Sequence, residues 1–119
     1  MATDIYSGRG WSKNHLGICD GGDIYSGHGW GKTLIGCYKA GDVFEGHGWG
    51  KTFIGSYKDG EITKGHGLSK EEIGSYKDGE IYQGRGWSKT QVGCYDGPDD
   101  GAAAAALLLL FLNGDDRNL

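Results

Sequence analysis

Short apolar runs alternate with glycine-rich polar stretches along the chain at a fixed interval. A pair such as Ile24-Tyr25 is followed within ten residues by a run such as Leu34–Tyr38, and the pattern then starts again. β-branched and aromatic residues favour strands, and a glycine inside the second run disfavours a helix. Each repetition therefore predicts two short strands, and residues 4–98 together predict an all-β meander of about ten strands.

The repeating unit is 19 residues long and occurs five times without an insertion or a gap. It reads acid–Ile–Tyr–x–Gly–(His/Arg)–Gly–Trp–x–Lys–Thr–x–Ile–Gly–small–Tyr–Lys–Asp–Gly. Units 1 to 5 span residues 4–22, 23–41, 42–60, 61–79 and 80–98. A lone two-stranded hairpin is marginally stable in water, so five hairpins must pack together into one domain.

Asp-Gly dipeptides join unit 3 to unit 4 at Asp59-Gly60 and unit 4 to unit 5 at Asp78-Gly79. Asp-Gly between two β-prone runs is typical of a two-residue type I′ hairpin turn. The register that follows pairs Lys58 with Glu61, Tyr57 with Ile62, Ser56 with Thr63, and, one unit later, Lys77 with Glu80. Strict alternation along the strand then predicts that Ile54 shares a face with Ser56.

The ends of the repeat array indicate how the units assemble. An open row leaves two unpaired sheet edges and needs end units that differ from the others. Units 1 and 5 are nearly as regular as the middle units. We therefore expect a closed ring with five-fold pseudo-symmetry, with the open row as the alternative.

The alternation Ile-Tyr-x-Gly followed by Ile-Gly-x-Tyr-x-Asp-Gly resembles the hairpin repeats of the bacterial β-flower proteins. The resemblance covers residues 4–98. It implies short hairpins that radiate around a central axis in a flower-like or propeller-like ring. The four-fold form of that family has four hairpins, whereas this chain has five. The resemblance brings no established activity with it.

After Pro98 the composition changes, and residues 99–119 form a separate segment. Asp99 and Asp100 precede the run Ala102–Leu112, whose alanines and leucines favour a helix, and Asn113-Gly114 suits its end. Eleven residues make a helix of about 16 Å, which is too short for a bilayer core of about 30 Å. A helix that is apolar on all sides must be buried. We expect it to pack on the repeats; the alternatives are self-association between chains into a homo-oligomer and contact with a membrane surface.

Composition and charge narrow the functional classes. The net charge is −4 and the isoelectric point is about 5.4, which argues against a nucleic-acid partner. Glycine accounts for 25 of 119 residues but has no three-residue period, so the chain is not collagen-like. Three cysteines occur without a Cys-x-x-Cys pair, and no apolar signal segment opens the chain. We expect a reduced protein of the cytoplasm that needs no cofactor.

The glycine-rich loops concentrate the candidate ligand-binding residues. At one position of the unit they carry, in order, Arg9, His28, His47, His66 and Arg85. Four residues later every unit has a lysine: Lys13, Lys32, Lys51, Lys70 and Lys89. Arginine in two units argues against a metal site, because arginine does not ligate metals and repels a cation. Backbone amides flanked by glycine, together with lysine, predict a site for an anionic ligand, against the alternative of solvated lysines.

The same loops carry a tryptophan in four of the five units: Trp11, Trp30, Trp49 and Trp87. Exposed, these rings would stack on sugars and make a glycan-binding module. Leu68 in unit 4 instead favours an apolar packing contact. No catalytic constellation stands out from the repeated acids, which favours a binding or structural module over an enzyme.

Overall fold

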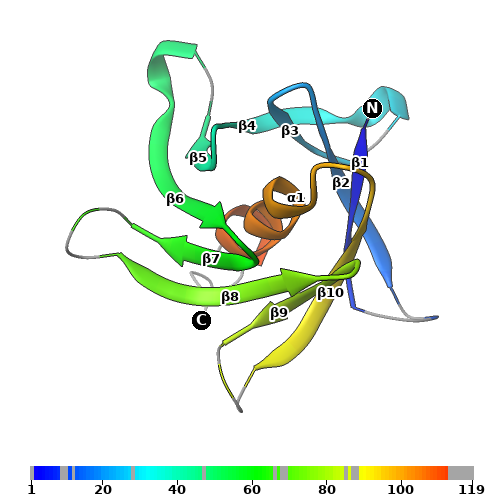
Figure 1. The fold of residues 1–119 in the computed structure, drawn as a ribbon. Coiled ribbons are helices and arrows are strands. Elements are labelled where there is room, and N and C mark those ends of the chain that lie inside the picture. The colour runs from blue at the N-terminus through cyan, green and yellow to red at the C-terminus, as the bar shows by residue number, and fades with distance from the viewer. Residues whose placement is uncertain are drawn as a thin grey trace.

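Ten antiparallel strands form one sheet that closes into a barrel around a short helix (Figure 1). The computed structural model describes residues 2–8, 11, 13–27, 29–46, 48–65, 67, 70–84, 86 and 89–112. The strands are β1 (Thr3–Ser7), β2 (Asn14–Asp20), β3 (Asp23–Ser26), β4 (Thr33–Lys39), β5 (Asp42–Glu45), β6 (Thr52–Lys58), β7 (Glu61–Lys64), β8 (Glu71–Lys77), β9 (Glu80–Gln83) and β10 (Thr90–Asp96). This confirms the predicted all-β ring of five two-stranded units.

The barrel closes where β1 pairs with β10, with Ile5 opposite Tyr95 and Tyr6 opposite Cys94. The backbone N–H of Gly8 donates to the carbonyl oxygen of Val92 at 2.9 Å across this junction. Equivalent bonds cross the other four junctions between neighbouring units at 2.7–3.0 Å. The last junction thus uses the same contacts as the internal ones, so the open-row alternative is wrong.

The Asp-Gly turns have the predicted geometry. Asp59 and Gly60 both have positive φ, 51° and 87°, as a type I′ turn requires. Lys58 lies opposite Glu61, and Ser56 lies opposite Thr63. Units 4 and 5 meet in the same register, with Lys77 opposite Glu80.

A β-bulge in every unit overturns one part of the predicted register. In unit 3, Val43 pairs with Gly55 and Phe44 pairs with Phe53, so Ile54 is the extra residue between them. Because a bulge interrupts the alternation of side chains, Ile54 packs against the buried core instead of sharing the outer face with Ser56. The prediction for Ile54 was wrong because strict alternation ignores this extra residue.

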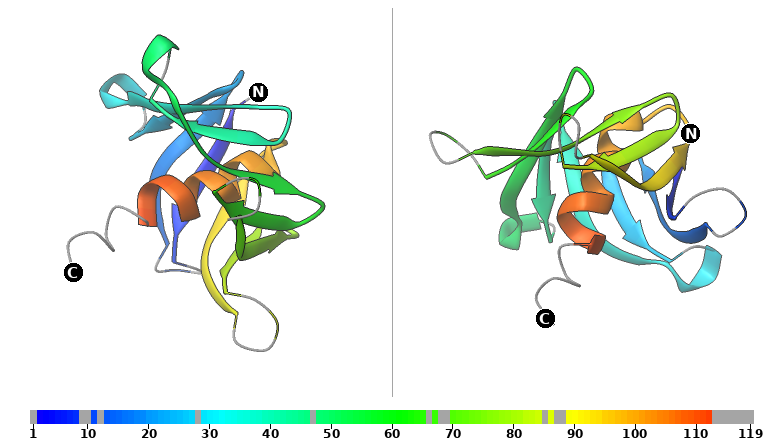
Figure 2. Two further views of the ribbon diagram at one scale, coloured as in Figure 1. Left: turned by 90° about the vertical axis from the view of Figure 1, so that its left-hand side faces the viewer. Right: turned by 90° about the horizontal axis from the view of Figure 1, so that it is seen from below.

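The tail segment forms α1 (Asp100–Ala106), which continues as the π-helix η6 (Leu107–Phe111). Both lie inside the barrel, along its axis (Figure 2). Residues 101–109 are buried, and the helix contacts strands on all sides of the ring. Most of the apolar run that self-association or membrane contact would use is therefore enclosed, and Leu110, Phe111 and Leu112 at its end are partly buried. The proposed end of the helix at Asn113-Gly114 lies outside the described residues.

Five glycines, one from each unit, leave room for the helix at the centre of the ring. A Cβ atom on Gly93 would lie 2.4 Å from Leu107 Cδ2, and one on Gly74 would lie 2.4 Å from Leu108 Cδ1. The same close approach continues around the ring, pairing Gly55 with Leu109, Gly36 with Leu110 and Gly17 with Phe111. Successive residues of the helix, from Leu107 to Phe111, therefore contact successive units of the barrel, from unit 5 to unit 1.

This one-to-one match accounts for the π-helix. Five units that complete a circle stand about 72° apart, whereas an α-helix turns about 100° per residue. Bonding to the fifth residue instead of the fourth widens the helix and reduces the turn per residue. The Leu112 N–H donates to the carbonyl oxygen of Leu107 in this manner. The five-fold ring and the wide helix therefore fit one another.

Candidate functional site

Three of the loop tryptophans, Trp11, Trp30 and Trp49, are in full contact with solvent. Trp30 lies in the middle of the short helical turn η2 (Gly29–Gly31), and Trp49 lies in the middle of the equivalent turn η3 (Gly48–Gly50). Trp11, Trp30 and Trp49 are 104%, 105% and 106% exposed. The interpretation of these three rings as apolar packing contacts was therefore wrong: a leucine at this position in unit 4 does not imply burial in the others.

The glycine-rich loops are carried by strand ends on separate sides of the barrel. The strand ends that carry them point away from the central helix on different sides of the ring (Figures 1 and 2). Each loop is consequently a separate contact point on the rim of the molecule. An array of equal sites fits this arrangement better than one pocket built from all five units.

The loop lysines fold back over the outer face of the barrel. Lys51 Nζ lies 4.7 Å from the centre of the Phe44 ring, and Lys32 Nζ lies 4.5 Å from the centre of the Tyr25 ring. Lys13 lies in the same way over Tyr6 at 4.4 Å, and Lys89 over Tyr82 at 4.8 Å. These are cation–π contacts within one unit, between its third and tenth residues. Unit 4 has Thr63 at the third position in place of the aromatic residue, with Lys70 at the tenth.

Neighbouring units enclose a groove on the outer face, which we call the outer groove. The groove between units 3 and 4 is lined by Ser56, Thr63 and Lys70, among others, and the groove between units 4 and 5 by the equivalent Ser75, Tyr82 and Lys89. A third groove, between units 2 and 3, has Cys37, Phe44 and Lys51 at these places. The same recess is therefore repeated around the barrel.

The outer grooves combine charges of both signs. Lys70 shares its groove with Asp42, Asp59 and Glu61. Lys89 shares its groove with Glu61, Glu72 and Glu80, as well as two aspartates. Asp59 and Glu61 flank the turn between units 3 and 4 in the first groove, and Asp78 and Glu80 flank the turn between units 4 and 5 in the second. This mixture weakens the attraction of these lysines for a free anion.

Buried hydroxyls and a thiol gather at the end of the barrel where the helix begins. Asp99 accepts a hydrogen bond from the Tyr38 hydroxyl at 2.7 Å, and its own N–H donates to Thr3 Oγ1 at 2.8 Å. Burial raises the pKa of Tyr38, and the bond to Asp99 adds to the effect. Burial likewise raises the pKa of the Cys19 thiol, with a smaller contribution from Asp99. The raised pKa values keep the Tyr38 hydroxyl and the Cys19 thiol protonated at neutral pH.

Several of the predicted site residues lie outside the described residues. They are Arg9, His28, His47, His66, Arg85 and Trp87. Within the described part of the chain, no cluster of three or more His, Cys, Asp or Glu side chains is arranged to hold a metal ion. No helix among the described residues has the length and apolar character to cross a membrane.

Sequence reasoning missed the outer grooves, although the signal for them is present in the repeat. The third and tenth residues of each unit, such as Tyr25 and Lys32, recur as an aromatic–lysine pair in every unit but the fourth. This pairing marks two residues that contact each other across the loop. Comparison with known proteins adds no further guide, because no family model, curated protein or solved structure matches the chain.

Proposed function

We propose that the protein is a non-catalytic, multivalent binding module whose loop tryptophans take up glycans. The observation that carries the proposal is the complete exposure of Trp11, Trp30 and Trp49. A tryptophan side chain fully in water leaves a large apolar ring unburied, and repeated exposed rings are characteristic of contact surfaces. The fold keeps each of these rings at a loop tip with its faces accessible.

Sugars match the chemistry of such a ring. One face of a pyranose presents C–H groups, which pack on the electron-rich face of an indole, while its hydroxyls remain in water. Single contacts of this kind are weak. Three or more of them on one rigid ring bind a polymeric glycan with an effective concentration that raises the overall affinity.

An anionic ligand is less well supported at the lysines. Lys13, Lys32, Lys51 and Lys89 already lie over aromatic rings of their own units. Carboxylates line the grooves of Lys70 and Lys89 and would repel an anion that approaches there. Glycan binding at the tryptophans would disturb neither the lysine–ring contacts nor the carboxylates of the grooves.

The test uses a panel of soluble oligosaccharides and insoluble polysaccharides, with tryptophan fluorescence and co-sedimentation as readouts. We expect the variant Trp30→Ala/Trp49→Ala to lose at least tenfold in affinity for the glycan that the parent binds. The matched control Lys32→Met/Lys51→Met alters the same two loops and is expected to bind like the parent. Binding should change little with salt, because the contact is not ionic.

The opposite pattern would reject the proposal. If the tryptophan variant binds as the parent does, and the lysine variant loses binding that also falls with salt, the ligand is anionic. The tryptophan variant should melt like the parent, whereas the lysine variant should melt slightly lower, because it removes two cation–π contacts. Both variants must be folded at the temperature of the binding assay, which circular dichroism checks.

We further propose that the chain is a five-unit relative of the β-flower proteins and that it works in the cytoplasm. The closed ring of radiating hairpins supports the kinship. The three cysteines are free thiols, which is compatible with a reducing compartment. A crystal structure with five superposable hairpins, together with fractionation of cells that express the tagged protein, tests both statements.

A further inference from the structure

We propose that the outer groove between units 3 and 4 binds a hydroxylated aromatic ring in the place that a tyrosine side chain fills in other units. Unit 4 departs from the repeat at one position of this groove, where Thr63 replaces Tyr6, Tyr25, Phe44 and Tyr82 of the other units. The proposal concerns a site distinct from the loop tryptophans and does not depend on glycan binding.

The loss of the ring is visible as space. The groove at Thr63 has a volume of about 810 Å³, against about 500 Å³ for the equivalent groove at Tyr82. The third groove, which contains Phe44, has about 440 Å³. All three are lined by corresponding residues of successive units, so the comparison is between like recesses. A volume of several hundred Å³ suits a small ligand.

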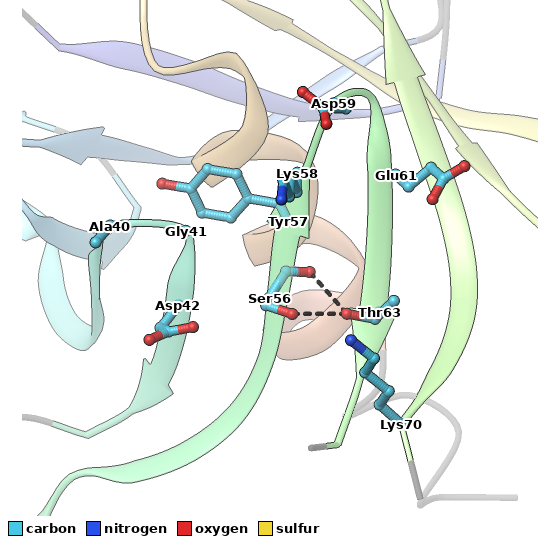
Figure 3. Close-up of a pocket in the computed structure, with 10 residues that line it drawn as sticks. All are labelled: Ala40, Gly41, Asp42, Ser56, Tyr57, Lys58, Asp59, Glu61, Thr63 and Lys70. Carbon is cyan, nitrogen blue, oxygen red and sulfur yellow. Dashed lines mark hydrogen bonds between the residues drawn. The ribbon is translucent and has the colours of Figure 1, made fainter. Parts of the chain in front are cut away.

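The groups that hold the ring in other units are still present around Thr63. In four units the lysine ammonium lies 4.4–4.8 Å from a ring centre, and Lys70 is the equivalent lysine. Figure 3 shows Lys70 extending along the groove toward Thr63, with Ser56 on the other side. The cation is therefore positioned over a place where unit 4 itself supplies no ring.

An acceptor for the ring hydroxyl is also in place. The Tyr82 hydroxyl donates to Glu80, and the Tyr25 hydroxyl lies 3.5 Å from Asp23 Oδ2. In each case the acid stands two residues before the tyrosine, on the same face of the strand. Glu61 stands at that position relative to Thr63. A phenol in the groove would therefore find both partners that units 2 and 5 provide for tyrosine.

The remaining lining selects against other ligands. The hydroxyls of Ser56 and Thr63 are 2.7 Å apart and bond to one another, which forms a neutral floor. Three carboxylates, Asp42, Asp59 and Glu61, outnumber the two lysines of the groove, Lys58 and Lys70, and the net negative charge disfavours a carboxylate or phosphate. A neutral ring with an electron-rich face meets the ammonium favourably, and its hydroxyl can donate to a carboxylate. The chemistry favours a phenol, whether free or as the tyrosine side chain of a peptide.

The experiment titrates the intact protein, labelled with ¹⁵N, with 4-methylphenol and follows the backbone amide resonances. We expect saturable shifts at Ser56, Thr63 and Lys70, with a dissociation constant on the order of 1 mM for so small a ligand. 4-Methylanisole, which cannot donate a hydrogen bond, should bind at least threefold more weakly. N-acetyltyrosinamide should bind more tightly than 4-methylphenol if the natural source is a peptide and no more tightly if it is a free phenol.

Three variants decide between this site and unspecific association. Thr63→Tyr restores the residue of the other units and should abolish the shifts while keeping the fold. Tyr82→Thr should create a second site, with new shifts at Ser75 and Lys89. Lys70→Met should weaken binding at least threefold.

Binding of 4-methylphenol by Thr63→Tyr at the same amides and with the same affinity would overturn the proposal. Absence of any saturable shift in the parent protein would do the same. Because Thr63→Tyr moves the sequence toward the repeat, an intact amide spectrum is expected for it. A matching spectrum rules out misfolding as the cause of lost binding.

Discussion

The inner and outer faces of the ring differ in how closely their residues follow the repeat. The five inner glycines, Gly17, Gly36, Gly55, Gly74 and Gly93, are the same in all units, whereas the outer third position changes from Tyr to Phe to Thr. A Cβ on any of these glycines would lie 2.0–2.5 Å from a carbonyl oxygen of the next unit. The outer side chains meet solvent instead. Packing therefore dictates the inner residues, while the outer surface is free to differ between units and to bind ligands.

The largest expected effect is a loss of stability on adding one methyl group inside the ring. Gly55→Ala places a Cβ 2.4 Å from the carbonyl oxygen of Thr63 and 2.8 Å from Leu109. Because backbone and helix must both shift, we expect a cost of about 3 kcal/mol or more in the free energy of unfolding. Denaturant unfolding followed by circular dichroism measures it.

The matched control lies in the same unit on the outside. A Cβ on Gly50 has no atom within 4 Å. Gly50→Ala should change the stability by no more than about 0.5 kcal/mol. Equal costs at the two glycines would contradict the contrast between the inner and outer positions.

The next effect concerns the helix at the centre. Leu107 is completely buried and faces Gly93. Leu107→Ala should destabilise the protein by about 2–5 kcal/mol, because it removes buried methyl groups and leaves a cavity. Leu112, which is only partly buried, should cost clearly less when changed to alanine. Thermal unfolding of both variants checks the order, and a chain cut after Gly101 should fail to melt cooperatively.

The tyrosines that lie against the helix should make the free energy of unfolding depend on pH in the alkaline range. Burial raises the pKa of Tyr57 to about 12, with Asp99 adding to the effect, whereas an unfolded tyrosine titrates near about 10. A raised pKa means that the folded state holds its proton longer, so the stability is complete below about pH 10 and falls between about pH 10 and 12. Tyr57→Phe should lessen this fall. Unfolding curves at neutral pH, where the variant should resemble the parent, provide the control.

The smallest expected effect is a difference in stability between two lysine variants on the outer face, one in unit 3 and one in unit 4. Lys51→Met removes a cation that lies 4.7 Å from the centre of the Phe44 ring and should cost about 0.5–1 kcal/mol. Lys70→Met, in the unit with Thr63, should cost less, because that unit lacks the ring. Comparison of the two unfolding midpoints measures the difference. If Lys70→Met costs as much as Lys51→Met, the ring does not explain the contribution of the lysine.

Some features of the candidate site could be predicted from the sequence of the repeat, and others could not. The position of Trp30 at a loop could be predicted, because glycine on both sides of it excludes a strand. Its exposure could not, since Leu68 at the equivalent position suggested burial. The outer groove at Thr63 could not be predicted either. The sequence shows that residue 63 departs from the repeat, but only the packing of units 3 and 4 shows that this substitution leaves a space.

The sequence alone determined the unit, its two strands, the turn register at Asp59-Gly60 and the presence of an apolar helix. These features depend on neighbours in the chain, through backbone preference and the exact period of 19 residues. Only the tertiary structure decided that the helix lies inside the ring, that Ile54 turns inward and that Leu107–Phe111 adopts a π-helix. Each of these depends on the width of a closed ring of ten strands, a property of all five units together that no single unit contains.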